Sequence, residues 1–204
     1  GERLLRSQLL LPFEKAVKSG AATVMTSYNQ VDGIPCTSNK RLLTDILRGE
    51  WGFDGFVYSD LYSIEVIHSL GAACDTAQAA SLALKAGLDM DLGGDAYGNN
   101  LKNELVKGAI SMDDINRAVA NVLRMKFRQG LFENPYVDPK RARTTCRSTE
   151  HIAIAEQVAE EGVVLLKNDE VLPLSPTLGR IAVIGPNADT PYNQLGDYTA
   201  PQAR

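Results

Sequence analysis

The pattern of apolar and polar positions along the first 130 residues predicts three successive helix–strand units. Three segments carry apolar residues at helical spacing, at 4–18, 39–49 and 76–86. Each is followed by a short apolar run typical of a buried strand, at 21–28, 55–60 and 88–92. A connection between two strands that is long enough to contain a helix usually joins parallel strands, so the pattern predicts an α/β fold.

Polar side chains before the predicted helices support their limits. Ser38 and Asp75 precede the second and third helices and are predicted to cap their N-termini. Two further helices are expected, near 98–107 and at 112–129. Ser111 and Asp114 have the spacing of a capping box, which predicts the start of the last of them.

The chain changes character after residue 130. Two architectures fit the first 130 residues, a slice of a (β/α) barrel or part of a doubly wound sheet. Three units cannot close a barrel, which needs about eight. Residues 131–150 lack a core pattern and are predicted to form a linker. A helix near 150–161 and apolar runs at 163–166 and 181–186 then predict the beginning of a second, incomplete α/β domain over 151–204.

Composition narrows the classes of partner. Of the 204 residues, 44% are hydrophobic and 23% charged, and the net charge is −4, so neither nucleic acid nor an anionic membrane surface is an expected partner. No apolar stretch approaches the roughly 20 residues that span a bilayer. The first residues do not resemble a signal peptide, and the compartment stays open. The three cysteines are too few and too far apart to indicate disulfides or a zinc site.

Several kinds of catalytic site find no support in the motifs. The two histidines, His68 and His151, lie near no nucleophilic serine or cysteine motif. No glycine-rich phosphate loop is present, and residues 184–187 resemble a dinucleotide turn only weakly. The acids Asp89 and Asp91 lack the spacing of a calcium loop, and structural or substrate contacts are expected for them. We therefore expect neither a cofactor nor a metal.

An acidic side chain remains as the strongest candidate for a catalytic residue. Asp60 ends the apolar run 55–60, and an acid at the carboxyl end of a buried parallel strand points to the edge where active sites lie. Glycoside hydrolysis uses two carboxyl groups, one as nucleophile or base and one as acid. Glu65 is the nearest candidate for the second group, although an acid in the first turn of a helix is more typically structural.

Motifs along most of the chain resemble those of glycoside hydrolase family 3. The resemblance is carried by residues 25–29 (MTSYN), 33–35 (GIP), 55–60 (GFVYSD) and 86–90 (AGLDM), and later by 162–168 (GVVLLKN) and 183–188 (VIGPNA). Each motif alone is weak, but their order and spacing together are specific. The resemblance implies that residues 1–130 are the C-terminal portion of a (β/α)8 TIM-like barrel and that 151–204 begin an α/β sandwich domain.

The family resemblance also implies a function and its residues. It implies retaining, exo-acting hydrolysis of β-linked glucosides, xylosides or N-acetylglucosaminides, with Asp60 as nucleophile and Tyr28 beside it as a substrate-binding aromatic residue. Leu61 stands where many β-glucosidases of the family have Trp, which is expected to alter the leaving-group subsite. The acid/base Glu of the family has no counterpart here and is expected outside this chain. Expected partners are a β-linked oligosaccharide or aryl glycoside, and the remaining parts of the same enzyme or a second copy.

Three alternatives remain open from the sequence. The chain could belong to a nucleotide-cofactor oxidoreductase that uses residues 181–187 as a cofactor turn, which a nicotinamide-binding titration would test. It could be a sugar-binding or assembly module without hydrolytic activity. It could also be one piece of a split enzyme, which the intact mass of the protein would reveal.

Overall fold

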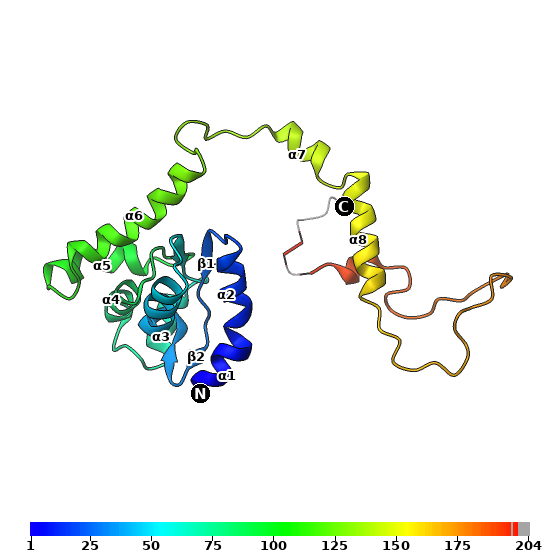
Figure 1. Ribbon diagram of the computed structural model, residues 1–204, viewed down its shortest axis with the longest axis horizontal. Coiled ribbons are helices and arrows are strands. Elements are labelled where there is room, and N and C mark those ends of the chain that lie inside the picture. Colours follow the sequence, from blue (N-terminus) through cyan, green and yellow to red (C-terminus); the bar gives the residue numbers. More distant parts are fainter. Residues whose placement is uncertain (197, 200–204) are drawn as a thin grey trace. The chain divides into compact units, whose positions relative to one another are not determined.

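The computed structural model describes residues 1–196, 198 and 199, and it divides into two compact units (Figure 1). The first unit is Gly1–Val137 and the second begins at Asp138. Residues 197 and 200–204, the last part of the expected second domain, lie outside the described residues. The two units are considered separately below.

Parallel pairing in the first unit confirms the α/β organisation. Strand β1 (Thr23–Met25) pairs in parallel with β4 (Phe56–Tyr58), with Val24 opposite Val57. Tyr58 also forms a parallel bridge with Met90, so a third segment continues the sheet on the other side of β4. Two of the three expected strands are therefore present in the expected direction, each shorter than predicted, and the third, expected over 88–92, is reduced to the bridge at Met90. The short hairpin of β2 (Gln30–Val31) and β3 (Ile34–Pro35) is a separate pair.

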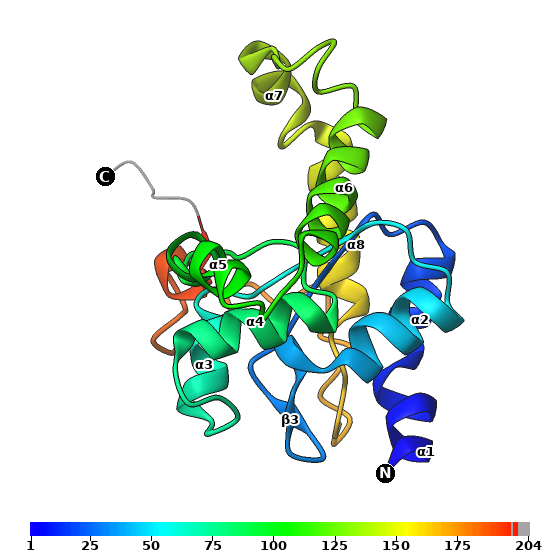
Figure 2. The same cartoon turned by 90° about the vertical axis from the view of Figure 1, so that its left-hand side faces the viewer.

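Helices connect the parallel segments and cover them. Figure 2 shows α3, α4 and α5 side by side, and α4 contacts both of its neighbours. The helices of the first unit are α1 (Glu2–Leu4), η1 (Leu5–Leu9), α2 (Leu11–Lys18), η2 (Cys36–Ser38), η3 (Arg41–Glu50), α3 (Ser63–Ser69), α4 (Thr76–Ala86), α5 (Ala96–Val106) and α6 (Met112–Arg128). The single helix expected over 4–18 is thus interrupted, and η1 and η3 have the wide hydrogen-bonding pattern of a π-helix.

Two of the three predicted helix starts are confirmed. The Asp75 carboxylate accepts a hydrogen bond from the backbone N–H of Gln78 at 2.7 Å, and Ser111 and Asp114 form the reciprocal capping box of α6. The prediction for Ser38 is wrong, because its hydroxyl donates to the carbonyl of Pro35. Asn39 takes that role instead, since its Oδ1 accepts from the N–H of Leu42 at 3.1 Å.

The core of the first unit lies around β4. Val57 is fully buried at the centre of the strand, and helices α3 and α4 pack apolar side chains around it. The largest fully buried apolar side chains of this core are Ile64, Ile67 and Leu88. Burial of each such side chain contributes roughly 1.5–3 kcal/mol. Together they stabilise β4, the strand that precedes Asp60 in the chain.

The second unit contains helices but no paired strand among its described residues. Helix α7 (Pro139–Thr145) lies within the expected linker, and α8 (Thr149–Glu161) follows at the expected place. The strands predicted at 163–166 and 181–186 are wrong for this structure. Leu166 is 92% exposed and Ile184 is 91% exposed, and neither segment pairs with another strand among the described residues. A strand exists only through hydrogen bonds to a neighbour, which an apolar run by itself does not provide.

Candidate active site

Asp60 lies directly beyond the carboxyl end of β4, where the chain turns into α3. Its side chain is half-buried, and Oδ1 accepts a hydrogen bond from the N–H of Leu61 at 2.7 Å. Its carbonyl accepts from the N–H of Ser63 at 3.1 Å, which closes a tight turn. Both bonds restrict the turn, so the carboxylate is presented in a defined direction.

Tyr28 approaches the same turn from the segment that follows β1. Its phenol O–H donates to the carbonyl oxygen of Leu61 at 2.6 Å. Tyr28 is 44% exposed and Leu61 is 46% exposed, so both side chains also face solvent. The structure therefore brings together Asp60, Tyr28 and Leu61, which the sequence singled out.

The third parallel segment holds the turn from its other side. The N–H of Ser59 donates to the carbonyl of Met90 at 2.9 Å, and the N–H of Leu92 donates to the Ser59 hydroxyl at 2.8 Å. Tyr62 adopts the left-handed region with φ of 57°, and its N–H donates to the carbonyl of Leu92 at 3.2 Å. A non-glycine residue in this region is held there at an energetic cost, and such positions often cluster at functional sites.

Asp89 is a structural acid beneath the site. Its buried carboxylate accepts from the N–H of Val57 at 2.8 Å and from the Asn121 amide at 2.9 Å, and it forms an ion pair with Arg48. Burial is the largest influence on both ions, raising the pKa of Asp89 and lowering the pKa of Arg48, while their mutual attraction acts in the opposite direction. The network anchors β4 three residues before Asp60.

Asp91 also has a structural role, at the carboxyl end of the third segment. It accepts from the Ser59 hydroxyl at 3.5 Å and from the N–H of Tyr97 at 3.2 Å. In the part of the chain that the structure describes, no three His, Cys, Asp or Glu side chains converge as metal ligands.

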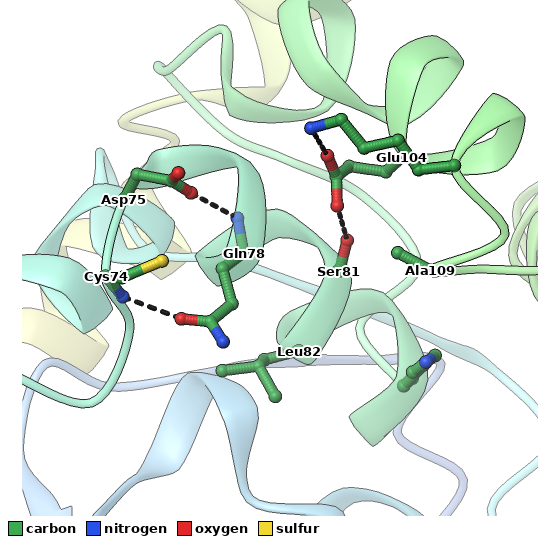
Figure 3. A pocket seen from close by; sticks show the side chains of 9 residues that line it. Cys74, Asp75, Gln78, Ser81, Leu82, Glu104 and Ala109 are labelled. Atoms are coloured by element: carbon green, nitrogen blue, oxygen red, sulfur yellow. Dashed lines mark hydrogen bonds and ion pairs between the residues drawn. The ribbon is translucent and has the colours of Figure 1, made fainter.

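Two cavities of the first unit lie away from Asp60. The first has a volume of about 400 Å³ and lies between α4 and α5. Figure 3 shows Ser81 and Glu104 facing one another, and the Ser81 hydroxyl donates to Glu104 at 3.1 Å. Lys107 also donates to Glu104, at 2.7 Å. The hydrogen bond from Lys107 lowers the pKa of Glu104, which makes this carboxylate a poor base. The second cavity, of about 360 Å³, is lined mainly by apolar residues of η1, α2, β1 and η3.

Two glycines that follow the third segment, Gly93 and Gly94, also shape the site and are not among the site residues predicted from the sequence. A Cβ built on Gly93 would collide with the end of the Leu61 side chain, and one built on Gly94 would collide with the Glu65 carboxylate. Oε2 of Glu65 is buried and without a hydrogen-bond partner, and the packing against Gly94 supports a structural role for this residue. The available signal was the Gly-Gly pair itself, since glycine at a strand end often marks a close backbone approach.

These features define an α/β protein that presents a carboxylate at the carboxyl edge of parallel strands. Residues 1–125 match the N-terminal domain of glycosyl hydrolase family 3, and residues 163–203 match the C-terminal domain of that family. The chain therefore belongs to glycosyl hydrolase family 3.

Curated relatives of the chain include glucosidases and xylosidases. It is 38% identical over 195 residues to a periplasmic beta-glucosidase of Salmonella typhimurium, covering 93% of this chain and 25% of the relative. It is 39% identical over 216 residues to a beta-xylosidase of Formosa agariphila, covering 97% of this chain and 29% of the relative. The chain thus spans about a quarter of the length of these relatives.

Solved structures show the same relationship. A beta-glucosidase from Listeria innocua in complex with glucose matches with a TM-score of 0.80 and 35% identity, over 86% of this chain and 24% of that one. A beta-glucosidase from Erythrobacter marinus matches with a TM-score of 0.73 and 38% identity, over 81% of this chain and 22% of that one.

Among the helices that the structure describes, none combines the length and the apolar character that a membrane-spanning helix needs.

Proposed function

We propose that the protein carrying this sequence is a retaining, exo-acting β-glycoside hydrolase of the β-glucosidase or β-xylosidase type, with Asp60 as its nucleophile. The observation that carries this proposal is the position of Asp60. In a chain of family 3, it is the acid at the tip of the central buried strand, on a turn fixed from both sides. The names of the relatives support the substrate class.

The proposed reaction is a double displacement. The Asp60 carboxylate attacks the anomeric carbon while the glycosidic C–O bond breaks, and a second carboxylic acid donates its proton to the leaving oxygen. The same second group then takes a proton from water, whose oxygen attacks the anomeric carbon and releases Asp60. The hydrogen bond from the N–H of Leu61 orients the Asp60 carboxylate for the first step.

The second carboxyl group is proposed to be a Glu outside these 204 residues. A retaining mechanism places it roughly 5–5.5 Å from the nucleophile. Glu65 is a poor candidate within the chain, because its carboxylate is packed against Gly94 with one oxygen buried. A proton donor has to reach the leaving group, which this packing opposes.

The domain organisation is part of the same proposal. We place the C-terminal portion of a (β/α)8 TIM-like barrel at 1–130, a linker at 131–150 and the beginning of an α/β sandwich domain at 151–204. The two family matches, which end at residue 125 and resume at residue 163, support this division.

Tyr28 and Leu61 are proposed to contact the substrate, a β-linked oligosaccharide or an aryl glycoside. Both are exposed beside Asp60, and an aromatic ring and an apolar side chain suit the faces of a sugar or its leaving group. The remaining parts of the enzyme, or a second copy, are proposed to complete the site.

Replacement of the nucleophile tests the proposal. Asp60→Ala in the native protein that carries this sequence is expected to reduce hydrolysis of aryl β-glucosides or β-xylosides on the order of 10³-fold or more. Sodium azide should partly restore turnover and give a glycosyl azide of the α configuration, because a small anion can replace the missing carboxylate. Asp45→Ala, which removes an exposed acid of η3, is the matched control and should leave activity unchanged. Unaltered activity of the Asp60 variant would refute the assignment.

A further inference from the structure

Gly93 follows the third parallel segment and packs closely against the side chain of Leu61, in the turn that carries Asp60. It has a φ of 73°, and a Cβ at this position would collide with Cδ2 of Leu61 and lie 3.4 Å from its Cγ. The atom that would have to move is the end of a flexible side chain. A side chain at position 93 would therefore displace Leu61 rather than the backbone of the strand.

The backbone of Leu61 is already fixed on both sides. Its N–H donates to Asp60 at 2.7 Å, and its carbonyl accepts from Tyr28 at 2.6 Å. With N–H and carbonyl both held, the side chain can respond to its surroundings only by changing rotamer. Because Gly93 has no side chain, Leu61 can adopt the rotamer observed.

We propose that Gly93 is a specificity-determining residue, which sets the position of the Leu61 side chain and thereby the choice of leaving group. The proposal rests on the proposed function, with Asp60 as nucleophile. A leucine side chain neither donates nor accepts hydrogen bonds, so it cannot recognise the hydroxyl groups of the sugar. It can pack against an apolar leaving group, and changes of methylene size in such contacts alter selectivity by roughly 10-fold or more.

The test compares two leaving groups in the native protein. Gly93→Ala is expected to lower kcat/KM for p-nitrophenyl β-glycosides relative to methyl β-glycosides by roughly 10-fold, the effect of a methylene-sized change in an apolar contact. Gly71→Ala is the matched control, because Gly71 has a φ of 75° but nothing within 4 Å of its would-be Cβ. It carries the same backbone strain without the collision, and its ratio should equal that of the wild type.

Gly93→Ala in a Leu61→Ala background distinguishes two causes, the collision with the Leu61 side chain and the backbone strain of alanine at φ of 73°. If Gly93 acts through Leu61, Gly93→Ala should change the ratio little in that background, and Leu61→Ala alone should lower it. These comparisons remain decisive if the single Gly93 variant folds poorly, because the smaller residue at position 61 removes the collision. An unchanged ratio in an active Gly93→Ala enzyme, or an equal change in both backgrounds, would overturn the inference. Failure of the proposed function is distinguishable, because the wild type itself would then hydrolyse neither glycoside.

Discussion

At the scale of single residues, the ion pair of Asp89 with Arg48 is the buried contact that holds β4. The side chain of Asp89 is fully buried. It accepts hydrogen bonds from Val57 and Asn121 and forms an ion pair with Arg48. Removing one partner of a buried pair leaves the other charge uncompensated. The strand beneath Asp60 therefore depends on this one carboxylate.

Asp89→Ala is expected to lower the free energy of unfolding by about 3–5 kcal/mol. The measurement is chemical denaturation of the native protein, with Asp45→Ala as an exposed control that should change stability by less than about 0.5 kcal/mol. A loss of similar size in both variants would show that the buried network does not stabilise β4.

The residues of the candidate site were partly predictable. Asp60 ends an apolar run and Asp89 lies in one, so the sequence predicts a strand-end position for Asp60 and a structural or substrate-contact role for Asp89. The contact of Tyr28 with the Leu61 carbonyl joins residues that are 33 positions apart. Gly93 was missed because its importance depends on which side chain lies opposite, and only the pairing of the segments decides that.

At the scale of elements, the start of η3 shows how local chemistry selects a cap. Ser38 and Asn39 are adjacent and both are common cap residues, so the sequence alone could not distinguish them. The hydroxyl of Ser38 is engaged with Pro35, whereas Asn39 is buried and bonded to the first turn of the helix.

Asn39→Ala is expected to reduce stability by about 1 kcal/mol, the usual effect of losing a cap. Ser38→Ala, the neighbouring control, should cost clearly less because its single bond is long. Chemical denaturation of both variants measures the difference, and a larger loss for Ser38→Ala would contradict the assignment.

A second element-scale feature links the N-terminal helices to η3. Arg6 forms ion pairs with Glu2 and Glu50, and Arg41 pairs with the same two acids. The hydrogen bond from Arg6 lowers the pKa of Glu50 below its usual value of 4.5. A carboxyl group with a lowered pKa in the folded state stabilises the fold above its unfolded pKa, and this stabilisation is lost as the pH falls through the folded value.

Stability should therefore decrease as the pH falls below about 4.5, and Glu50→Gln should show a weaker decrease. Thermal unfolding of both proteins between neutral pH and pH 3 tests this, and 1 M salt should reduce the difference because the groups are exposed. Identical pH profiles would mean that the cluster contributes nothing.

At the scale of the whole molecule, the parallel order of the first unit was predictable and the second unit was not. Helical spacing followed by short apolar runs leaves few alternatives to parallel segments when the connections are long. The runs at 163–166 and 181–186 have the composition of buried strands, but they are exposed in the described structure. Composition indicates which segments can be buried, but it does not identify the segment against which they would pack.

A polypeptide of these 204 residues alone is expected to associate and to show negligible hydrolysis of aryl β-glycosides. Exposed apolar segments such as 163–166 favour association, and the proposed acid is missing. Light scattering and a glycosidase assay on the purified polypeptide test the two expectations. Robust turnover would show that the second carboxyl group lies within this sequence.

The residue that becomes glycosylated during turnover identifies the nucleophile directly. The native protein would be inactivated with a 2-deoxy-2-fluoro β-glycoside carrying a good leaving group, digested, and examined by mass spectrometry. We expect a fluoroglycosyl ester on the peptide that contains Asp60, and fragmentation should place it on that residue. An adduct on a different carboxylate in an enzyme that hydrolyses β-glycosides would contradict the assignment of Asp60 as the nucleophile.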